Sequence, residues 1–555
     1  MVRPEAKHKN LRSARRPGTG VYEMKLLLNG DEAVAAAALD CGVNLGTGYP
    51  GTPSTEILEE FDKLGGRAQW APNEKVAMEV AIGACFAGAR ALVTMKHVGL
   101  NVAADPLFTV AYEKVNGALV VVSADDPGMA SSQDEQDNRR YAVFAGVPML
   151  EPADSQEAYD YMKLALEISH KWNKPVMLRM TTRVCHSKTA VERMEKPLPP
   201  AAISYAKDAP GHIMMPAFAR AAHRQLRAKL HEMQKWNDES GPNKIIEGSK
   251  SLGIITSGIS FQHVRDAAPE ASVLKLGMTY PLPIETIRKF AAGVDRCLVV
   301  EEGDPYLVEQ IRYAGINVEE KLEEFRFGEL NIDRVRKLIA KDTTPEPKAV
   351  PGKPPALCPG CPHRSSFENF RDANYIVAGD IGCYGLGALA PFEANDTSVC
   401  MGASIPVGLG LRHVLPAEQA KKVVSVLGDS TFMHTGINGL IEMVYNPPPT
   451  GHVLVILDNG ITAMTGMQEN PGTGRRLDHT GTNKVDFVAL IRALGVKNVH
   501  VIDPVVKKAE YAKLLEESLE KPEITVIIAR RECLLAAKSI REWEKMNAEQ
   551  CSVCN

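Results

Sequence analysis

Short apolar runs rich in β-branched residues alternate along this chain with longer stretches whose apolar residues recur at helical spacing. In the first third, the helical stretches are 32–41, 55–64 and 76–87, and the strand-like runs are 91–95, 119–123 and 176–180. The alternation returns after residue 250, with strand-like runs at 252–255, 273–275 and 297–300, and a third time after residue 356. Strands that alternate with helices predict parallel sheets covered by helices, so we expect an α/β fold.

Breaks in this alternation divide the chain into segments. Prolines and a basic helical stretch at 218–236 follow the first α/β segment, and the stretch 344–355 is too rich in proline for a helix or a central strand. No repeat with a period of about 20–50 residues is present, which excludes a solenoid or a propeller. We expect, in order, a basic N-terminal tail at 1–23, an α/β domain at 24–195, a connector at 196–249, a smaller α/β domain at 250–340, a proline-rich linker at 341–355, an α/β domain at 356–541 and a C-terminal tail at 542–555.

The composition removes whole classes of protein. With 555 residues, of which 45% are apolar and 24% charged, the chain has the make-up of a globular protein and the length for about three to four domains. The net charge of −4 gives no reason to expect nucleic acid as a partner. No apolar run approaches the ~20 residues of a membrane span, and the basic N-terminus has no secretory apolar segment. We therefore expect no membrane contact and a cytoplasmic location.

Two strand-like runs in the last α/β segment end in polar residues. The run 422–427 is followed by Gly-Asp-Ser and the run 453–457 by Asp-Asn-Gly, so that Asn459 follows Asp429 by 30 residues. Parallel sheets bind ligands at the carboxyl ends of their strands, and Mg²⁺ prefers oxygen ligands that it shares with phosphates. The side chains of Asp429 and Asn459 and the main-chain carbonyl of Ile461 are therefore candidate ligands for Mg²⁺ on a diphosphate. The spacing resembles the thiamine diphosphate motif, although ordinary Gly-Asp and Asp-Asn turns give the same letters.

Two pairs of the 11 cysteines have CxxC spacing, Cys358/Cys361 and Cys551/Cys554. In an intracellular chain this spacing indicates metal or redox chemistry rather than disulfide bonds. A CxxC pair by itself fits a zinc site, a redox pair or one side of an iron–sulfur site, since thiolates suit both zinc and iron–sulfur clusters. The spacing alone leaves these three interpretations open.

Several further motifs, in order along the chain, carry a family resemblance. They are YPGTPSTE at 49–56, NEKVA at 73–77, MKHVGLN at 95–101, LCPGCPHR at 357–364, GDIGCY at 379–384, CMGAS at 400–404 and TAMTG at 462–466. Together they closely resemble the α subunits of the indolepyruvate ferredoxin oxidoreductase family, within the thiamine diphosphate-dependent 2-oxoacid:ferredoxin oxidoreductases. The resemblance covers about residues 24–541, nearly the whole chain.

The resemblance implies a fold and an activity. It implies two thiamine diphosphate-binding, doubly wound parallel-sheet domains, of the pyrimidine-binding type at 24–195 and the diphosphate-binding type at 356–541, flanking a smaller transketolase C-terminal-like α/β domain. The implied reaction is the oxidative decarboxylation of aryl pyruvates to aryl-acetyl-CoA. The implied cofactors are thiamine diphosphate, Mg²⁺ and a 4Fe-4S cluster. A smaller β subunit in a hetero-oligomer, ferredoxin as electron acceptor, coenzyme A and an aryl pyruvate are the implied partners and substrates.

The resemblance also implies roles for single residues. It makes Glu74 the glutamate that activates the aminopyrimidine, with Glu79 in reserve. It places Thr52 and Arg139 against the substrate carboxylate, which a guanidinium can bind through two hydrogen bonds. The alternative for Arg139 is a surface ion pair with a neighbouring acidic residue. Met464 replaces a polar residue of pyruvate-type relatives, which suits an aryl side chain, although packing alone would also explain it. The expected cofactor contacts are Glu74, Gly428, Asp429, Ser430, Asn459, Met464 and Thr465.

The relatives hold a 4Fe-4S cluster near the thiamine through four cysteines. Those positions are filled here by Cys358, Cys361, Cys383 and Cys533. The alternative is that Cys383 and Cys533 are small buried hydrophobic residues. The family continues into a ferredoxin-like module with two further clusters. Since one CxxC at 551–554 cannot supply their ligands, we expect no complete ferredoxin module in this chain.

Two other functions remain open on the sequence. A non-oxidative thiamine-dependent decarboxylase or carboligase would need the same Asp429, Asn459 and Glu74 but no cluster. A non-catalytic scaffold subunit with a zinc-type CxxC would bind neither thiamine nor iron. Iron content separates the oxidoreductase from both.

Overall fold

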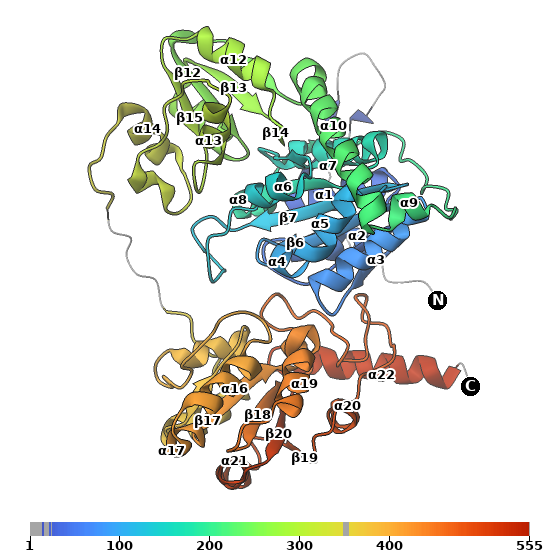
Figure 1. Ribbon diagram of the computed structural model, residues 1–555, viewed down its shortest axis with the longest axis vertical. Coiled ribbons are helices and arrows are strands. Elements are labelled where there is room, and N and C mark those ends of the chain that lie inside the picture. The colour runs from blue at the N-terminus through green and yellow to red at the C-terminus, as the bar shows by residue number, and fades with distance from the viewer. Residues whose placement is uncertain (1–13, 16–21, 24, 348–353, 554–555) are drawn as a thin grey trace. The chain divides into compact units, whose positions relative to one another are not determined.

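The computed structural model describes residues 14–15, 22–23, 25–347 and 354–553, with side chains for 25–347 and 354–548. These residues form two compact units, Met1–Glu346 and Pro347–Asn555, which are considered separately below (Figure 1). Most of the predicted N-terminal tail, the linker residues 348–353 and Cys554 lie outside the described residues. None of the described helices has the length and apolar character needed to cross a membrane.

A seven-stranded sheet forms the centre of the first unit, in the order β14-β8-β9-β7-β6-β4-β5. Its strands are parallel except that β14 runs antiparallel to β8, and the central strand β7 is buried throughout. The strands are β4 Leu45–Gly48, β5 Ala68–Trp70, β6 Arg90–Lys96, β7 Ala118–Asp125, β8 Met149–Leu150, β9 Val176–Thr181 and β14 Met278–Tyr280. The parallel sheet predicted for this segment is confirmed.

Helices cover both faces of this sheet, as right-handed crossovers require. Helices α1, α2 and α7 pack together, and α3 packs against α5. The helices are α1 Gly30–Asp40, α2 Thr55–Lys63, α3 Glu74–Phe86, α4 Gly99–Val102, α5 Ala104–Tyr112, α6 Arg139–Ala145, α7 Ser155–Trp172, α8 Thr182–His186, α9 Ala209–His212 and α10 Pro216–Ser240. The predicted helical stretches coincide with α1, α2 and α3 to within two residues at each end. A small antiparallel pair, β3 Lys25–Leu28 with β10 Thr189–Glu192, lies beside them.

A second, four-stranded sheet in the same unit has the order β11-β13-β12-β15. Its strands are β11 Lys244–Ile246, β12 Ser249–Ser257, β13 Ala271–Leu276 and β15 Cys297–Val300, and its helices are α11 Ser260–Ala267, α12 Ile284–Ala292, α13 Tyr306–Tyr313 and α14 Ile332–Ala340. Strand β14 lies within the segment predicted as the smaller domain, yet it pairs with β8 of the first sheet. The basic stretch of the connector forms α10, which packs against α5 and α12.

The second unit is built on a five-stranded parallel sheet in the order β16-β17-β18-β20-β19. The strands are β16 Ile376–Ala378, β17 Val423–Gly428, β18 His452–Asp458, β19 Asn498–Ile502 and β20 Ile524–Arg530. The helices are α15 His363–Asp372, α16 Ser404–Val414, α17 Ala417–Ala420, α18 Asp429–Thr431, α19 Ile437–Tyr445, α20 Phe487–Ala493, α21 Lys508–Glu520 and α22 Ala537–Val553. Helix α22 runs across the domain boundary predicted at 541 and carries Cys551.

Candidate functional site

The edge of the second unit where β17 and β18 end carries the predicted metal ligands. The two strands are parallel and pair Gly428 with Leu457, so Asp429 and Asn459 follow neighbouring strand ends. Gly428 allows a close approach here, because a Cβ atom at this position would lie 2.8 Å from Cε1 of Tyr384. The chain turns directly from Gly428 into α18, which places Asp429 in the first turn of a helix. The predicted arrangement of Asp429 and Asn459 at one sheet edge is thus present.

Asp429 is a buried carboxylate with a second carboxylate near it. Its side chain is 3% exposed. Burial and the charge of Asp458 raise the pKa of Asp429 well above its usual range, while the N–H of Ser430 and the side chain of Asn470 lower it. Asp458 itself accepts a hydrogen bond from Nε of Arg530 at 2.7 Å. A divalent cation would stabilise the ionised form of Asp429, so the residues fit a hard metal ion.

Asn459 follows the neighbouring strand β18 and is also buried. Its Oδ1 accepts the N–H of Ile461 at 3.2 Å, and its Nδ2 lies 3.4 Å from Nε2 of His363. Oxygens of Asp429 and Asn459 are ligand types that Mg²⁺ prefers. His363 belongs to the LCPGCPHR motif, and its contact with Asn459 links that motif to the strand end.

The loop after β18 folds back over the loop after β17. Oγ1 of Thr462 donates to Oγ of Ser430 at 2.9 Å, and Nδ2 of Asn470 donates to Oγ1 of Thr462 at 3.3 Å. Asn470, which touches both Thr462 and Asp429, was missed by the sequence analysis, since no spacing rule marks a residue in the middle of a loop. The two loops therefore form one polar surface around Asp429.

The remaining predicted cofactor contacts lie on the same loop. Thr465 donates through Oγ1 to Oε1 of Gln468 at 2.6 Å. Met464 is 56% exposed, so packing within this unit does not explain its apolar side chain. Met464 therefore exposes an apolar side chain on the otherwise polar loop that follows β18.

Helix α22 packs against the later part of this loop, around Arg475 and His479. The ring of His479 stacks on Trp543 with 3.8 Å between centroids, and the guanidinium of Arg475 lies over the same indole. Arg475 also pairs with the buried Glu469 at 2.8 Å. The loop that follows Asn459 is thus fixed at both ends.

The four cysteines predicted to hold a cluster lie near one another. Burial and the charges of Cys361, Cys533 and Cys358 raise the pKa of Cys383 to about 11. Cys361 donates its N–H to the carbonyl of Cys358 at 3.0 Å, and Cys533 donates its N–H to the carbonyl of Asn459 at 3.0 Å. The four cysteines are therefore close neighbours, and the backbone of Cys533 contacts that of the predicted metal ligand Asn459.

The spacing of these thiols bears on which metal they suit. Sulfurs of a tetrahedral zinc site lie about 3.8 Å apart, given Zn–S bonds of about 2.3 Å. Over the described part of the chain, no three cysteine sulfurs come within 4.8 Å of one another. Over the same described residues, the thiols are therefore not arranged as a compact tetrahedral zinc site.

Glu74 lies in the first unit as the first residue of α3. Its side chain is 5% exposed, and Asn73 caps the helix by accepting the N–H of Val76 at 2.9 Å. Gly99 makes room for the carboxylate, because a Cβ atom there would lie 2.6 Å from Oε1 of Glu74. Glu79, the reserve candidate, forms an ion pair with Lys75 on the helix surface. Burial therefore favours Glu74 over Glu79.

Thr52 lies between β4 and α2, in a loop stabilised by its own polar groups. Gly51 donates its N–H to Oγ1 of Thr55 at 2.9 Å, and Oγ of Ser54 donates to the carbonyl of Gly51 at 2.9 Å. Thr52 itself is partly exposed. The structure therefore leaves Thr52 on a defined loop at the carboxyl end of β4.

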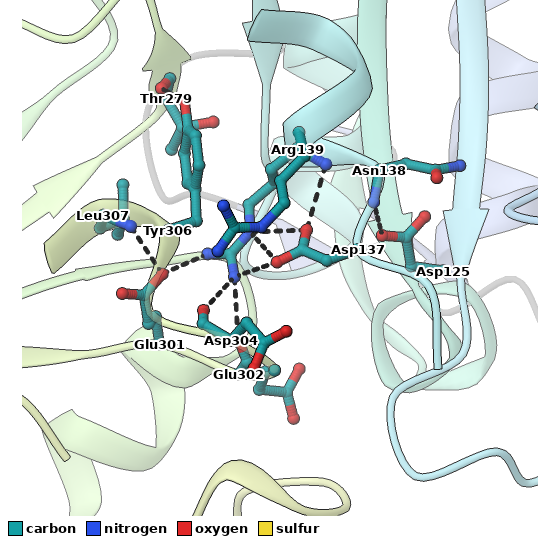
Figure 2. A network of polar contacts seen from close by, with 12 residues as sticks. Asp125, Asp137, Asn138, Arg139, Thr279, Glu301, Glu302, Asp304, Tyr306 and Leu307 are labelled. Atoms are coloured by element: carbon teal, nitrogen blue, oxygen red, sulfur yellow. Dashed lines mark hydrogen bonds and ion pairs between the residues drawn. The ribbon is translucent and has the colours of Figure 1, made fainter. Parts of the chain in front are cut away.

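Arg139 occupies a different environment from the one predicted. Its guanidinium is 1% exposed and pairs with Asp137 at 2.6 Å and with Glu301 at 2.7 Å (Figure 2). It also donates to the carbonyls of Glu302 and Asp304 at 2.8 and 3.2 Å. Glu301 in turn accepts the N–H groups at the start of α13. The guanidinium thus joins the loop before α6 to the second sheet of the same unit.

These contacts correct the predicted role of Arg139. The acidic groups bind the guanidinium on the sides that a substrate carboxylate would need. The ion-pair alternative holds instead, with the difference that the pair is buried and that one partner, Glu301, is remote in sequence. Arg139 is therefore a structural residue of the first unit.

This buried ion pair predicts a large loss of stability on truncation. Arg139→Met leaves the buried Glu301 without its paired cation and removes the nearest cation from Asp137, which should destabilise the fold by about 3–5 kcal/mol. The neighbouring Arg140 pairs with Glu309 on the surface, where both side chains are about half exposed. Arg140→Met should therefore cost at most about 1 kcal/mol. Urea unfolding of both variants measures the difference, and equal losses would contradict the buried role of Arg139.

Comparisons with known proteins agree with this architecture. Residues 36–244 match the family described as "Pyruvate flavodoxin/ferredoxin oxidoreductase, thiamine diP-bdg", and residues 380–529 match "Thiamine pyrophosphate enzyme, C-terminal TPP binding domain". The second match contains Asp429 and Asn459, and the first contains Glu74. Each of the two units thus carries a match to a thiamine-binding family.

Curated relatives match over most of the chain. The indolepyruvate oxidoreductase subunit IorA of Archaeoglobus fulgidus is 38% identical over 96% of this chain and 90% of its own length. The subunit of the same name from Methanothermobacter thermautotrophicus is 39% identical with the same coverage. The 2-oxoglutarate synthase subunit KorA of Archaeoglobus fulgidus is 25% identical over 55% of this chain and 99% of its own length.

Proposed function

The chain belongs to the family of indolepyruvate oxidoreductase IorA subunits, and from this premise we propose that it catalyses the oxidative decarboxylation of aryl pyruvates to aryl-acetyl-CoA. The proposal includes thiamine diphosphate with Mg²⁺ as cofactor, a 4Fe-4S cluster as the first electron acceptor, and ferredoxin as the final one. A smaller β subunit completes the enzyme. The observation that carries the proposal is the buried carboxylate of Asp429 beside Asn459, at two parallel strand ends within a thiamine-binding family match.

The residues around Asp429 would hold the diphosphate end of the cofactor. Asp429 and Asn459 provide the side-chain oxygens for Mg²⁺, and the carbonyl of Ile461 provides a third ligand. Gly428 and Ser430 would face the diphosphate from the loop after β17. Bound thiamine diphosphate supplies the electron sink through which a 2-oxoacid loses carbon dioxide.

Glu74 would act on the other end of the cofactor. Its buried carboxylate would accept a hydrogen bond from the aminopyrimidine ring and hold the tautomer that removes the proton from thiazolium C2. Thr52, at the carboxyl end of β4, is the proposed partner of the substrate carboxylate. The exposed Met464 would contact the aryl group of the substrate, where an apolar side chain costs no hydrogen bond.

The four cysteines would carry the electrons away. Oxidative decarboxylation releases two electrons, which need an acceptor close to the cofactor. Cys533 is bonded through its N–H to the carbonyl of Asn459, one of the proposed Mg²⁺ ligands, so a cluster on these thiolates would lie close to the diphosphate.

Replacing one of these cysteines should remove the cluster but keep the cofactor. In Cys383→Ser we expect iron to fall by about four atoms per chain, because a 4Fe-4S cluster needs four thiolates. Acceptor reduction should be lost, while thiamine diphosphate stays bound. Cys400→Ser is the matched control, since Cys400 is exposed and lies outside the set of four. Iron and thiamine are assayed in each variant after anaerobic purification. Zinc in place of iron, or about twelve irons in the isolated chain, would contradict the assignment of one cluster to these four cysteines.

The reaction itself is tested on the chain purified anaerobically with its partner subunit. We expect ferredoxin reduction that depends on indolepyruvate, coenzyme A and thiamine diphosphate together. Release of an aldehyde without ferredoxin reduction would instead support the non-oxidative decarboxylase. Binding of neither thiamine nor iron would support the scaffold subunit.

A further inference from the structure

A second cluster of ligand-type side chains lies in the first unit, and none of its three members is a proposed thiamine, Mg²⁺ or iron–sulfur ligand. It consists of Asp31, Glu56 and His186, one ligand atom of each lying within 4.8 Å of those of the other two. Asp31 lies in the first turn of α1, Glu56 in the first turn of α2, and His186 is the last residue of α8. Three separate helix ends therefore converge on one point.

Asp31 is the unusual member of this cluster. Its side chain is fully buried, and neither carboxylate oxygen accepts an N–H or O–H hydrogen bond from the described residues. Only the thiol of Cys185, a weak donor, contributes a hydrogen bond to it. Burying a carboxylate without hydrogen-bond partners costs on the order of several kcal/mol of folding free energy, so the position of Asp31 needs an explanation.

The charges around Asp31 increase this cost. Burial and the neighbouring charge of Glu56 raise the pKa of Asp31 well above its usual range. No lysine or arginine of the described residues forms an ion pair with Asp31 or Glu56, and the nearby Lys188 pairs with Glu32 instead. The positive ends of the α1 and α2 helix dipoles favour the two carboxylates, but each dipole end is equivalent to only about half an elementary charge.

We propose that Asp31, Glu56 and His186 bind a divalent cation of the zinc class. Zinc binds carboxylate oxygens and neutral imidazole nitrogens, and open zinc sites have three protein ligands with water in the remaining position. Ligand atoms of such a site lie about 3.3 Å apart, so the exposed side chains of Glu56 and His186 need only small rotations to reach this geometry. The cation would supply the charge that the buried Asp31 lacks.

The position of the cluster gives the cation a structural consequence. Glu56 follows the loop that carries Thr52, and His186 follows the carboxyl end of β9. A cation held by both would tie the residue after this loop to the end of α8 and to the start of α1. The loop bearing Thr52 would then be fixed by a metal ion that takes no part in the thiamine site.

Zinc binding tests the proposal on the full chain purified with its partner subunit. The protein is dialysed against zinc with thiamine diphosphate and Mg²⁺ in excess, so that the Asp429 site stays filled, and is then desalted. We expect about one bound zinc per chain by mass spectrometry of the metal. The X-ray absorption of this zinc should show oxygen and imidazole ligands, whereas zinc at the cluster cysteines would show sulfur and zinc near Asp429 would be displaced by the excess Mg²⁺ and thiamine diphosphate.

Two variants and a control identify the ligands. Glu56→Gln and His186→Gln keep the size of exposed side chains and should weaken zinc binding at least about tenfold. His170→Gln, an exposed histidine at the end of α7, should bind zinc as the unchanged protein does. An unchanged protein that holds no zinc, a sulfur ligand shell, or equal zinc in both variants and the control would each overturn the proposal.

Discussion

Replacement of Asp429 by alanine is expected to leave the purified protein without thiamine diphosphate. Asp429 is the only charged group among the proposed Mg²⁺ ligands, and the cation links the diphosphate to the protein. Loss of an outer partner of a metal ligand already costs about 10–100-fold in metal affinity, so loss of the ligand itself should cost at least as much. The bound cofactor is measured after desalting, by fluorescence of the oxidised thiamine.

Asp372→Ala provides the matched control for this experiment. Asp372 is a carboxylate of the same unit that pairs with Arg371 on the surface, where its side chain is 63% exposed. Its replacement should leave the cofactor content unchanged. If Asp429→Ala retained as much thiamine diphosphate as Asp372→Ala, the proposed metal site would be wrong.

Glu74→Gln is expected to slow exchange of the C2 proton of bound thiamine diphosphate by about 10²–10⁴-fold, the usual contribution of a positioned acid or base. Glutamine keeps the size of the side chain but cannot stabilise a protonated ring, so the cofactor should stay bound. The holoenzyme is diluted into deuterated buffer, the exchange is stopped by rapid quenching, and the remaining C2 proton is measured by NMR.

The reserve candidate serves as the control. Glu79 lies five residues after Glu74 on α3 and forms a surface ion pair with Lys75. Glu79→Gln should therefore leave the exchange rate of the C2 proton unchanged. Slow exchange in Glu79→Gln together with normal exchange in Glu74→Gln would transfer the role to Glu79.

The sequence predicted the parts of this molecule that depend on local pattern. The strands that end at Gly428 and Asp458 are mostly apolar and rich in β-branched residues, with Ser425 as the one polar residue inside β17, as expected where helices cover both faces of a parallel sheet. Once both are strands, parallel pairing brings Asp429 and Asn459 to one edge. The position of the two proposed metal ligands at one sheet edge could therefore be predicted without any knowledge of distant contacts.

Features that depend on distant contacts escaped prediction. The buried partner of Arg139 is Glu301, 162 residues away, and nothing near Arg139 in the sequence indicates it. Strand β14 has only three residues, too few for a periodic pattern, so its pairing with β8 could not be foreseen. Asp31, Glu56 and His186 come from three helix ends whose convergence depends on how α1, α2 and α8 pack.

The contacts of Arg139 also constrain how this protein can change over evolutionary time. A neutral substitution at Asp137 or Glu301 would leave the buried guanidinium short of negative charge, and a neutral substitution at Arg139 would remove the cation nearest to both carboxylates. Single changes at these three positions should therefore be selected against, while joint changes to apolar residues of similar volume can preserve the fold. Lineages of this family should exchange the whole set together or keep it whole, so that residues 137, 139 and 301 vary as one inherited unit.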